Sequence, residues 1–356
     1  MSDEDGLDAI IIGAGITGLA LATRLAAEGL SIRVLEARDR VGGRLLSVAS
    51  NDAHPLDLGA SWFWADEARV HELVARLGVR VHPQHTAGDA LFQTTAGVQR
   101  LHGNPIDAPA MRLQDGAQSV ALALAAPLGS TIRLDAPVEA VAVVDTTDGR
   151  RVDVRHRDGT LRARCVVIAL PPALAVARIR FDPPLPTDIA ALAARTPVWM
   201  GAITKAVAEY DDPFWRELGL AGAAVSHTGP LRELHDLSGP SGRPAALFGF
   251  AAPGDGPISP AAVLAQLVEL FGERARTPRA LHLHDWRREE WTSPADVEQH
   301  TDYATYGDPR WRSAMHERLW LASTETGQDH PGHIEGALAA AEHVGDALCS
   351  FIRAAP

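Results

Sequence analysis

Hydrophobic and polar positions follow two different periods within the first 36 residues. Residues 9–12 form a short apolar run, and residues 32–35 (IRVL) form a second short stretch in which only Arg33 is polar. Between them, after the glycine-rich stretch 13–18 (GAGITG), apolar side chains recur at helical spacing until Gly29, at Leu19, Leu21, Ala22, Leu25 and Ala26. The pattern predicts a strand, a tight turn, a helix and a second strand, which together make a βαβ unit.

The turn of this unit has the spacing G-x-G-x-x-G. Gly13 permits the sharp turn, Gly15 lets the backbone approach a pyrophosphate, and Gly18 lets the helix pack closely on the sheet. The free N–H groups at the helix N-terminus favour phosphate. Glu36, at the end of the second strand, is placed to accept hydrogen bonds from ribose hydroxyls. The unit predicts dinucleotide binding, and by itself it leaves NAD and FAD open.

The next segments alternate between clear and weak patterns. Residues 66–77 have a helical period with Asp66 as the expected cap and Gly78 as the stop. Residues 86–115 show no strong period, which predicts irregular strands and loops, and residues 116–128 predict a short helix. Strands are expected at 132–134, 138–144, 152–156 and 161–170, with hairpin turns at Asp148-Gly149 and Asp158-Gly159.

The second half begins with a proline-rich extended crossing at residues 181–186 (FDPPLP). Strands are expected at 198–209 and 245–251, with a turn at 212–215, and Ser259-Pro260 predicts the start of a helix that ends at Phe271. Near the end, the pattern predicts a strand at residues 319–322, a polar turn at 323–326 and a helix that begins at His333.

Several of these stretches resemble one known family. Gly42-Gly43-Arg44, which follows Glu36 through Ala37 and Arg38, resembles the glycine doublet of the flavin-containing amine oxidase superfamily, where it supports the FAD phosphates and ribityl chain. The stretch 57–61 (DLGAS) resembles the one that brings backbone against the flavin. Residues 181–215 and 319–344, and Trp286 with Tyr303, are similar to the monoamine oxidase group. The resemblance keeps its order over nearly the whole chain.

The resemblance implies an α/β fold with a Rossmann-like FAD-binding domain of the glutathione-reductase type and an inserted, smaller α+β substrate domain. It places residues 1–82, 120–198 and 295–356 in the FAD domain, and 83–119 and 199–294 in the substrate domain. The large helical insert of the amine oxidases is missing here, so the substrate domain is reduced.

The residues that the resemblance places around FAD are Gly13, Gly15, Ile16, Thr17, Gly18, Glu36, Ala37, Arg38, Gly42, Gly43, Arg44, Gly59, Ala60, Ser61, Trp62, Val138, Trp286, Thr324, Glu325 and Ile334. For two of them a plainer interpretation stays open. Val138 fits any sheet, and Trp286 fits a hydrophobic core. Some family members hold FAD through a cysteine before the first cage tyrosine, and Asp302 stands at that position here. We therefore expect non-covalent FAD.

Three residues are candidates for the chemistry. Lys205 aligns with the lysine that holds a water against flavin N5, and it is the only charged residue between Ala202 and Ala208. Burying an ammonium is costly unless it has a partner or a role. The alternative is a strand-edge lysine that reaches solvent. The relatives pair two tyrosines into an aromatic cage. Tyr303 matches the first, whereas His333 stands at the second, where it can hydrogen-bond or titrate. Alternatively, His333 is a helix-end residue without contact to the substrate.

Composition and charge exclude several classes of binding partner. The net charge of −12 argues against nucleic acid or an anionic membrane surface. No apolar run approaches the ~20 residues of a membrane helix, and the acidic residues 1–5 lack the features of a secretory signal. Cys165 and Cys349 give no disulfide framework, and no histidine pair is accompanied by further metal ligands. We expect a soluble, cytoplasmic monomer or homodimer without a metal.

The implied activity is oxidation of an amine C–N bond by hydride transfer to flavin N5, with O2 as electron acceptor and a small amine as substrate. A second hypothesis keeps the fold and makes the protein a flavin-dependent dehydrogenase, desaturase or isomerase, in which His333 serves as acid or base. A third is a flavin-binding protein without turnover.

Overall fold

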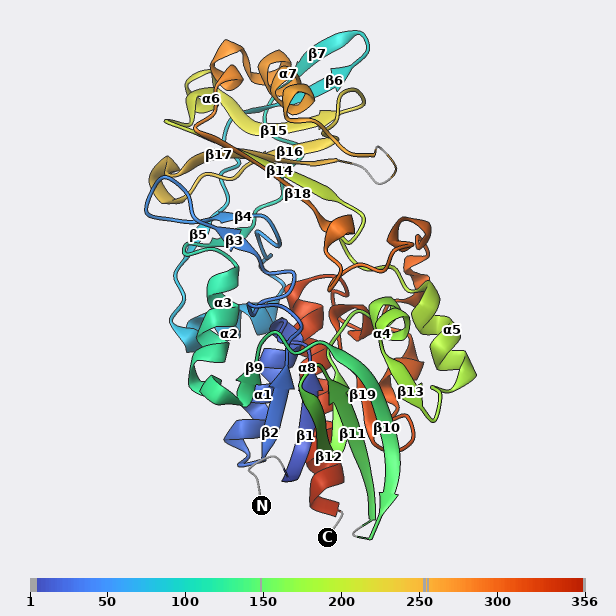
Figure 1. Cartoon of the computed structure of the whole chain (residues 1–356). Coiled ribbons are helices and arrows are strands. Elements are labelled where there is room, and N and C mark those ends of the chain that lie inside the picture. Colours follow the sequence, from blue (N-terminus) through green and yellow to red (C-terminus); the bar gives the residue numbers. More distant parts are fainter. Residues whose placement is uncertain (1–4, 148, 252–253, 255, 355–356) are drawn as a thin grey trace.

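The computed structural model describes residues 5–147, 149–251, 254 and 256–354, and it contains two large sheets at opposite ends of the molecule (Figure 1). The acidic residues 1–4 and Asp148 of the first expected hairpin turn lie outside the described residues. The start of β1 (Asp5–Ile12) and the end of α8 (Ile334–Ala354), which are the first and last described elements, lie at the same end of the molecule (Figure 1).

The larger sheet has eight strands and contains the expected βαβ unit. Strand β1 (Asp5–Ile12), helix α1 (Ile16–Ala27) and strand β2 (Ile32–Leu35) follow one another, and β1 pairs in parallel with β2. The sheet order is β13-β10-β11-β12-β1-β2-β9, with β19 paired to β12. The other strands are β9 (Ile132–Arg133), β10 (Val138–Thr146), β11 (Gly149–His156), β12 (Gly159–Ile168), β13 (Arg180–Asp182) and β19 (Leu319–Leu321).

Helices cover both faces of this sheet, which explains why β1 is apolar at consecutive positions. Ile11 faces the core formed with α1, α2 (Ala68–Leu77), α3 (Gln118–Ala125) and α8 (Ile334–Ala354). Ile10 and Ile12 face the opposite core, with α4 (Pro172–Arg178) and α5 (Thr187–Arg195). The antiparallel meander β10-β11-β12 confirms the three-stranded unit that the hairpin signals predict.

The second sheet has seven strands in the order β18-β14-β17-β16-β15-β6-β7. They are β6 (Asp89–Thr94), β7 (Gly97–Leu101), β14 (Thr204–Tyr210), β15 (Leu220–Ser226), β16 (Glu233–Asp236), β17 (Ala245–Ala251) and β18 (Ala280–Asp285). Helix α7 (Pro260–Phe271) packs on it and begins as predicted, because the Ser259 hydroxyl accepts a hydrogen bond from the Ala262 N–H. Short pairs β3 (Ser47–Val48) with β4 (Leu56–Asp57), and β5 (Val81–Pro83) with β8 (Met111–Leu113), lie between the large sheets.

Some sequence predictions were wrong in detail. The expected strand 198–209 starts only at Thr204, because residues 198–203 form a turn closed by the Gly201 N–H and Val198 carbonyl. The turn expected at 212–215 instead leads into the one-turn helix α6 (Phe214–Glu217), whose Trp215 is fully buried. The unpatterned segment 86–115 contains the regular hairpin β6-β7. Helices α4 and α5 were not predicted.

Asp66 does not cap α2. The N-cap residue is Glu67, and the Asp66 carboxylate instead lies 3.0 Å from Nε2 of His330. Gly78 ends the helix as predicted, in the left-handed conformation with φ 65°. The burial of Glu67 rather than Asp66 matters for the cavity described below.

We propose the division of the chain into two domains at the boundaries given above, since β14 to β18 all belong to the second sheet.

In the part of the chain that the structure describes, no helix has the length and apolar character needed to cross a membrane.

The packing around the first glycine turn gives a stability prediction. A Cβ added at Gly18 would lie 2.0 Å from the Gly13 carbonyl oxygen, whereas a Cβ at Gly15 would meet no atom within 4 Å. We expect Gly18→Ala to lower the free energy of unfolding of the cofactor-free protein by about 1–3 kcal/mol, and Gly15→Ala to lower it by less than about 1 kcal/mol. Urea unfolding measures both. Equal losses would contradict the packing role of Gly18.

Candidate active site

One cavity of about 630 Å³ is lined by residues of both large sheets and of the segments between them. Its lining comes from the glycine turn and α1, the end of β2, the segment 42–45, the segment 58–64, β14, β16, β17 and the start of α8. These segments are far apart in the sequence. The cavity is therefore a product of tertiary structure, and it is large enough for a cofactor and a small substrate.

One end of the cavity is a backbone cradle. Helix α1 starts at Ile16, and its N-cap residue Gly15 offers no side-chain cap. The first N–H groups of the helix therefore have no partner within it. A second glycine segment runs alongside, because Gly42 forms a parallel bridge with Gly15 and a Cβ on Gly43 would lie 3.3 Å from the Gly15 Cα atom. This arrangement suits an anionic group such as a pyrophosphate.

Glu36 lies at the edge of this cradle, as the sequence predicts. Its side chain is nearly buried, and its carboxylate accepts hydrogen bonds from the N–H groups of Ala14 (2.8 Å) and Arg38 (3.0 Å). The two contacts fix the carboxylate at the carboxyl end of β2, where it lines the cavity.

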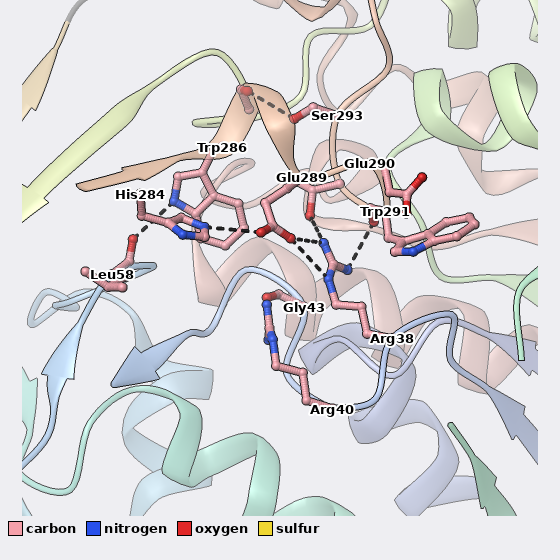
Figure 2. A network of polar contacts seen from close by, with 12 residues as sticks. Arg38, Arg40, Gly43, Leu58, His284, Trp286, Glu289, Glu290, Trp291 and Ser293 are labelled. Atoms are coloured by element: carbon pink, nitrogen blue, oxygen red, sulfur yellow. Dashed lines mark hydrogen bonds and ion pairs between the residues drawn. The ribbon is translucent and has the colours of Figure 1, made fainter. Parts of the chain in front are cut away.

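Arg38 also lines the cavity, but its guanidinium is already held by the segment that follows β18 (Figure 2). Nη2 donates to a Glu289 carboxylate oxygen (2.8 Å) and to the Thr292 hydroxyl (2.7 Å), and Nη1 donates to the Trp291 carbonyl (3.2 Å). The neighbouring Arg40 points to the Gly43 carbonyl instead, at 3.1 Å (Figure 2). Arg38 thus joins the cradle to the second sheet.

Arg44 and Glu325 form a buried ion pair. Two guanidinium nitrogens of Arg44 lie 2.5 and 3.1 Å from the two carboxylate oxygens of Glu325, which is fully buried. Burial alone would raise the pKa of Glu325, but the Arg44 charge outweighs it and holds the pKa below its usual value. Arg44 lines the cavity and Glu325 does not, so Glu325 acts on the cavity through Arg44.

Lys205 is buried, and its ammonium lies on the cavity wall. Nζ donates to the Ser61 hydroxyl (2.5 Å) and the Gly59 carbonyl (3.0 Å), and it lies 4.3 Å from the centre of the Phe248 ring. Burial lowers the pKa of Lys205 to about 7, against the opposing charge of Asp57. Of the two sequence interpretations, the strand-edge lysine that reaches solvent is wrong.

His333 lines the cavity just before α8. Its Nδ1 lies 2.7 Å from an oxygen of Glu67, and its ring stacks on Trp64 with centroids 5.0 Å apart. The Trp199 ring is 6.1 Å away, and it also lines the cavity. Histidine and two tryptophans therefore make an aromatic wall where the resemblance implies two tyrosines.

Tyr303 is not part of that wall. It is half exposed, does not line the cavity, and packs behind Trp199 with ring centroids 5.9 Å apart. Gly18 likewise stays out of the cavity, because it packs against Gly13 and Ala169. All other residues that the sequence proposes, apart from Glu325, line it. Trp286 does so while its Nε1 donates to the Leu58 carbonyl at 3.1 Å (Figure 2).

The sequence reasoning missed an acidic wall residue, Glu233. His235 next to it is buried, with Nδ1 2.5 Å from Asp107 and Nε2 2.9 Å from Glu233. Burial opposes protonation of His235, but the two carboxylates outweigh it and raise its pKa, and the hydrogen bond from His235 lowers the pKa of Glu233. Glu233 is thus an anion on the cavity wall. Its alternation with His235 on a short strand gives no signal that distinguishes it from a surface residue.

Comparisons with known proteins agree with this geometry. Residues 87–349 match the family described as flavin containing amine oxidoreductase, and residues 11–77 match the NAD(P)-binding Rossmann-like domain. The chain belongs to the flavin-containing amine oxidoreductase family. The family assignment confirms the resemblance and the Rossmann-like fold class, and it makes the protein an FAD-dependent oxidoreductase of the amine oxidase type.

Three relatives illustrate the range of the family. A putative flavin-containing monoamine oxidase, AofH of Mycobacterium tuberculosis, is 26% identical over 437 aligned positions, which cover 93% of this chain and 94% of the relative. Because that alignment is longer than this chain, the relative carries segments that this chain lacks. An L-amino acid dehydrogenase of Synechocystis is 30% identical over 256 positions, 67% of this chain and 51% of the relative. A solved structure of putrescine oxidase bound to putrescine shares the fold, with a TM-score of 0.84, 22% identity and coverage of 97% and 99%.

The residues present fit FAD. The uncapped α1 N-terminus and the paired glycine segments leave backbone N–H groups open to a pyrophosphate, and Glu36 stands where a ribose would follow. A Cβ at Gly59 would lie 2.0 Å from the Arg44 carbonyl oxygen, so the DLGAS segment can approach the cavity only with glycine there.

The lowered pKa of Lys205 predicts how stability depends on pH. The unfolded chain keeps the lysine proton up to pH ~10.4, whereas the folded protein releases it near pH 7, so raising the pH stabilises the native state. We expect the free energy of unfolding of the cofactor-free protein to rise by about 1–2 kcal/mol between pH 7 and 9 relative to Lys205→Met. Urea unfolding of both proteins at the two pH values measures this difference. A constant difference would mean that Lys205 stays protonated throughout.

Proposed function

We propose that this protein oxidises a small amine with FAD, and that the amine binds between Lys205 and His333. The observation that carries the proposal is that both side chains line the same cavity as the glycine cradle. A bound flavin would supply the acceptor for the hydride that leaves the carbon next to the amine nitrogen. The comparisons favour this chemistry over a desaturase, an isomerase or a binding protein without turnover.

The chain's own residues would position the substrate and keep water out. Trp64, Trp199 and His333 provide flat faces on one side of the cavity, and Phe250 lines another part of the wall. Gly59 and Ser61 accept two hydrogen bonds from the Lys205 ammonium, which leaves its third N–H group for an ordered water in the cavity. This supports its expected role, and the aromatic wall takes the place that the resemblance gave to Tyr303.

We propose O2 as the electron acceptor, as the resemblance implies. The relatives include proteins named as oxidases and one named as a dehydrogenase, so the acceptor is a separate question from the amine chemistry.

We further propose that the substrate carries a second cationic group, as in a diamine. Glu233 would receive it, because its carboxylate lines the cavity and is held by the buried His235. The putrescine oxidase that shares this fold supports the proposal, since putrescine is a diamine.

The test of the main proposal is the absorbance of the purified holoprotein during anaerobic addition of putrescine, cyclohexylamine and benzylamine. We expect a yellow protein whose flavin bleaches with at least one amine, recovers in air with release of hydrogen peroxide, and is released on denaturation.

Three outcomes would overturn parts of this proposal. Bleaching without recovery in air would exclude O2 as acceptor, and flavin that stays with the denatured chain would exclude non-covalent binding. A flavin that no amine bleaches would exclude the proposed amine chemistry.

Removing the charge of Glu233 tests the diamine proposal. A hydrogen bond to a charged group contributes about 1.5–3 kcal/mol, so we expect Glu233→Gln to raise the KM for putrescine about 10- to 100-fold. Cyclohexylamine has no second cation and is the matched control, with a KM that changes less than about threefold. Steady-state oxygen consumption measures both. An equal rise for the two amines would show that Glu233 supports the wall without binding a cation.

A further inference from the structure

Glu67 and His333 form a pair that the proposed function does not use. Glu67 is 1% exposed, and its carboxylate has two contacts, one to the N–H of Trp64 (2.9 Å) and one to Nδ1 of His333 (2.7 Å). A carboxylate only accepts hydrogen bonds, so Nδ1 carries the hydrogen. Nε2 then holds a lone pair. Among the residues that the structure describes, none bonds Nε2, and the ring lies on the cavity wall.

The surroundings keep the pair in place, and the ring of His330 lies 5.9 Å from that of His333. Trp64 stacks on the imidazole at an interplanar angle of 29°. The charged groups nearby have partners of their own: His330 binds Asp66, Glu335 binds Arg69, and Glu325 binds Arg44. In the described part of the chain, His333 is the one side chain that bonds the Glu67 carboxylate. The buried Glu67 carboxylate is therefore in direct contact with His333.

Amine oxidation creates a need for such a pair. A primary amine has a pKa close to that of lysine, ~10.4, so it reaches the cavity as an ammonium at neutral pH. Loss of a hydride from the neighbouring carbon requires the neutral amine, whose lone pair stabilises the developing positive charge. A proton must therefore leave the substrate first.

We propose that His333 takes this proton and that Glu67 is its positioning residue. The N–H bond of the ammonium breaks, the proton forms a bond to Nε2 of His333, and the electron pair stays on the amine nitrogen. The resulting imidazolium donates through Nδ1 to the Glu67 carboxylate, which stabilises its charge. No oxidant is consumed in this step. The imidazolium keeps the proton while the hydride leaves, and the proton returns to solvent through the exposed part of the ring afterwards. The proposal rests on the proposed amine oxidation.

Lys205 is another group on the wall that could take up a proton. Its Nζ is already committed to Gly59 and Ser61 and lies over the Phe248 ring, whereas Nε2 of His333 is open to the cavity. The geometry therefore assigns the proton to His333.

The experiment compares wild-type protein with His333→Phe and Glu67→Gln, each as the holoprotein. Anaerobic stopped-flow measurements give the second-order rate constant for flavin bleaching by putrescine or cyclohexylamine from pH 7 to 10. We expect the wild-type value to change little between pH 7.5 and 9. Without the imidazole only the free neutral amine reacts, so the His333→Phe value should rise about tenfold per pH unit. It should be about 100-fold below wild type at pH 7.5 and within about threefold at pH 10. Glu67→Gln should show a smaller loss of the same form.

His102→Gln is the control, because His102 is exposed, lies 3.6 Å from Asp89 and does not line the cavity, so this change should leave the profile unchanged. A second readout is independent of turnover. The carbon beside the nitrogen of tert-butylamine has no hydrogen, so this amine can bind without reacting. Its Kd, from the flavin spectrum, should follow the ionisation of the free amine in His333→Phe and not in wild type.

The outcomes separate this inference from the proposed function. If no amine bleaches the wild-type flavin, the proposed function is wrong, and this inference falls with it. If the wild type bleaches and His333→Phe or Glu67→Gln keeps the wild-type pH profile, the proton-acceptor role alone is wrong. A uniform loss at every pH would show that the pair only supports the wall.

Discussion

The buried ion pair between Arg44 and Glu325 is the constraint on which the rest of the site depends. The two residues are 281 positions apart in the sequence, and Glu325 also accepts a hydrogen bond from the Trp199 N–H while Arg44 donates to the Trp199 carbonyl. Three separate segments thus meet at one pair of charges. Removing Arg44 would cost about 3–5 kcal/mol, because the charge of the fully buried Glu325 would lose its partner. The pair fixes the cofactor loop, the start of the second sheet and the return to α8 relative to one another.

The same principle recurs around the cavity. Each ionisable group on the wall is held by a buried or backbone partner: Lys205 by Gly59 and Ser61, His333 by Glu67, and Glu233 by His235. Groups that are fixed before the substrate arrives need little rearrangement during the reaction, which is how an enzyme site lowers a barrier electrostatically. These partner residues lie in the loop that contains Gly59 and Ser61, at the N-terminus of α2 (Glu67) and in β16 (His235). The packing of the two sheets therefore also fixes the positions of the ionisable groups in the cavity.

The parts of the fold that could be predicted have local signals. Short stretches of neighbouring residues determine the βαβ unit, the meander and the Ser259 cap of α7. The hairpin β6-β7 could not be predicted, because it is stabilised by pairing with β15, whose partner residues are more than 100 positions away. The choice of Glu67 over Asp66 as the N-cap residue has the same origin. Asp66 is the better capping residue by sequence, but its carboxylate pairs with His330, and the Glu67 side chain is buried against His333 without capping the helix.

The sequence by itself determined the dinucleotide-binding unit, the family resemblance and the candidacy of Lys205, because glycine spacing, periodicity and a lone charge in an apolar strand act over short stretches. Only the tertiary structure decided which residues share the cavity. It moved Tyr303 behind Trp199, placed Glu325 behind Arg44, and brought Trp64, Glu67 and Glu233 to or near the wall. These positions depend on the burial and pairing of charges from distant segments. The free-energy cost of burying these charges is offset only by contacts between distant segments, which form when the two sheets pack together.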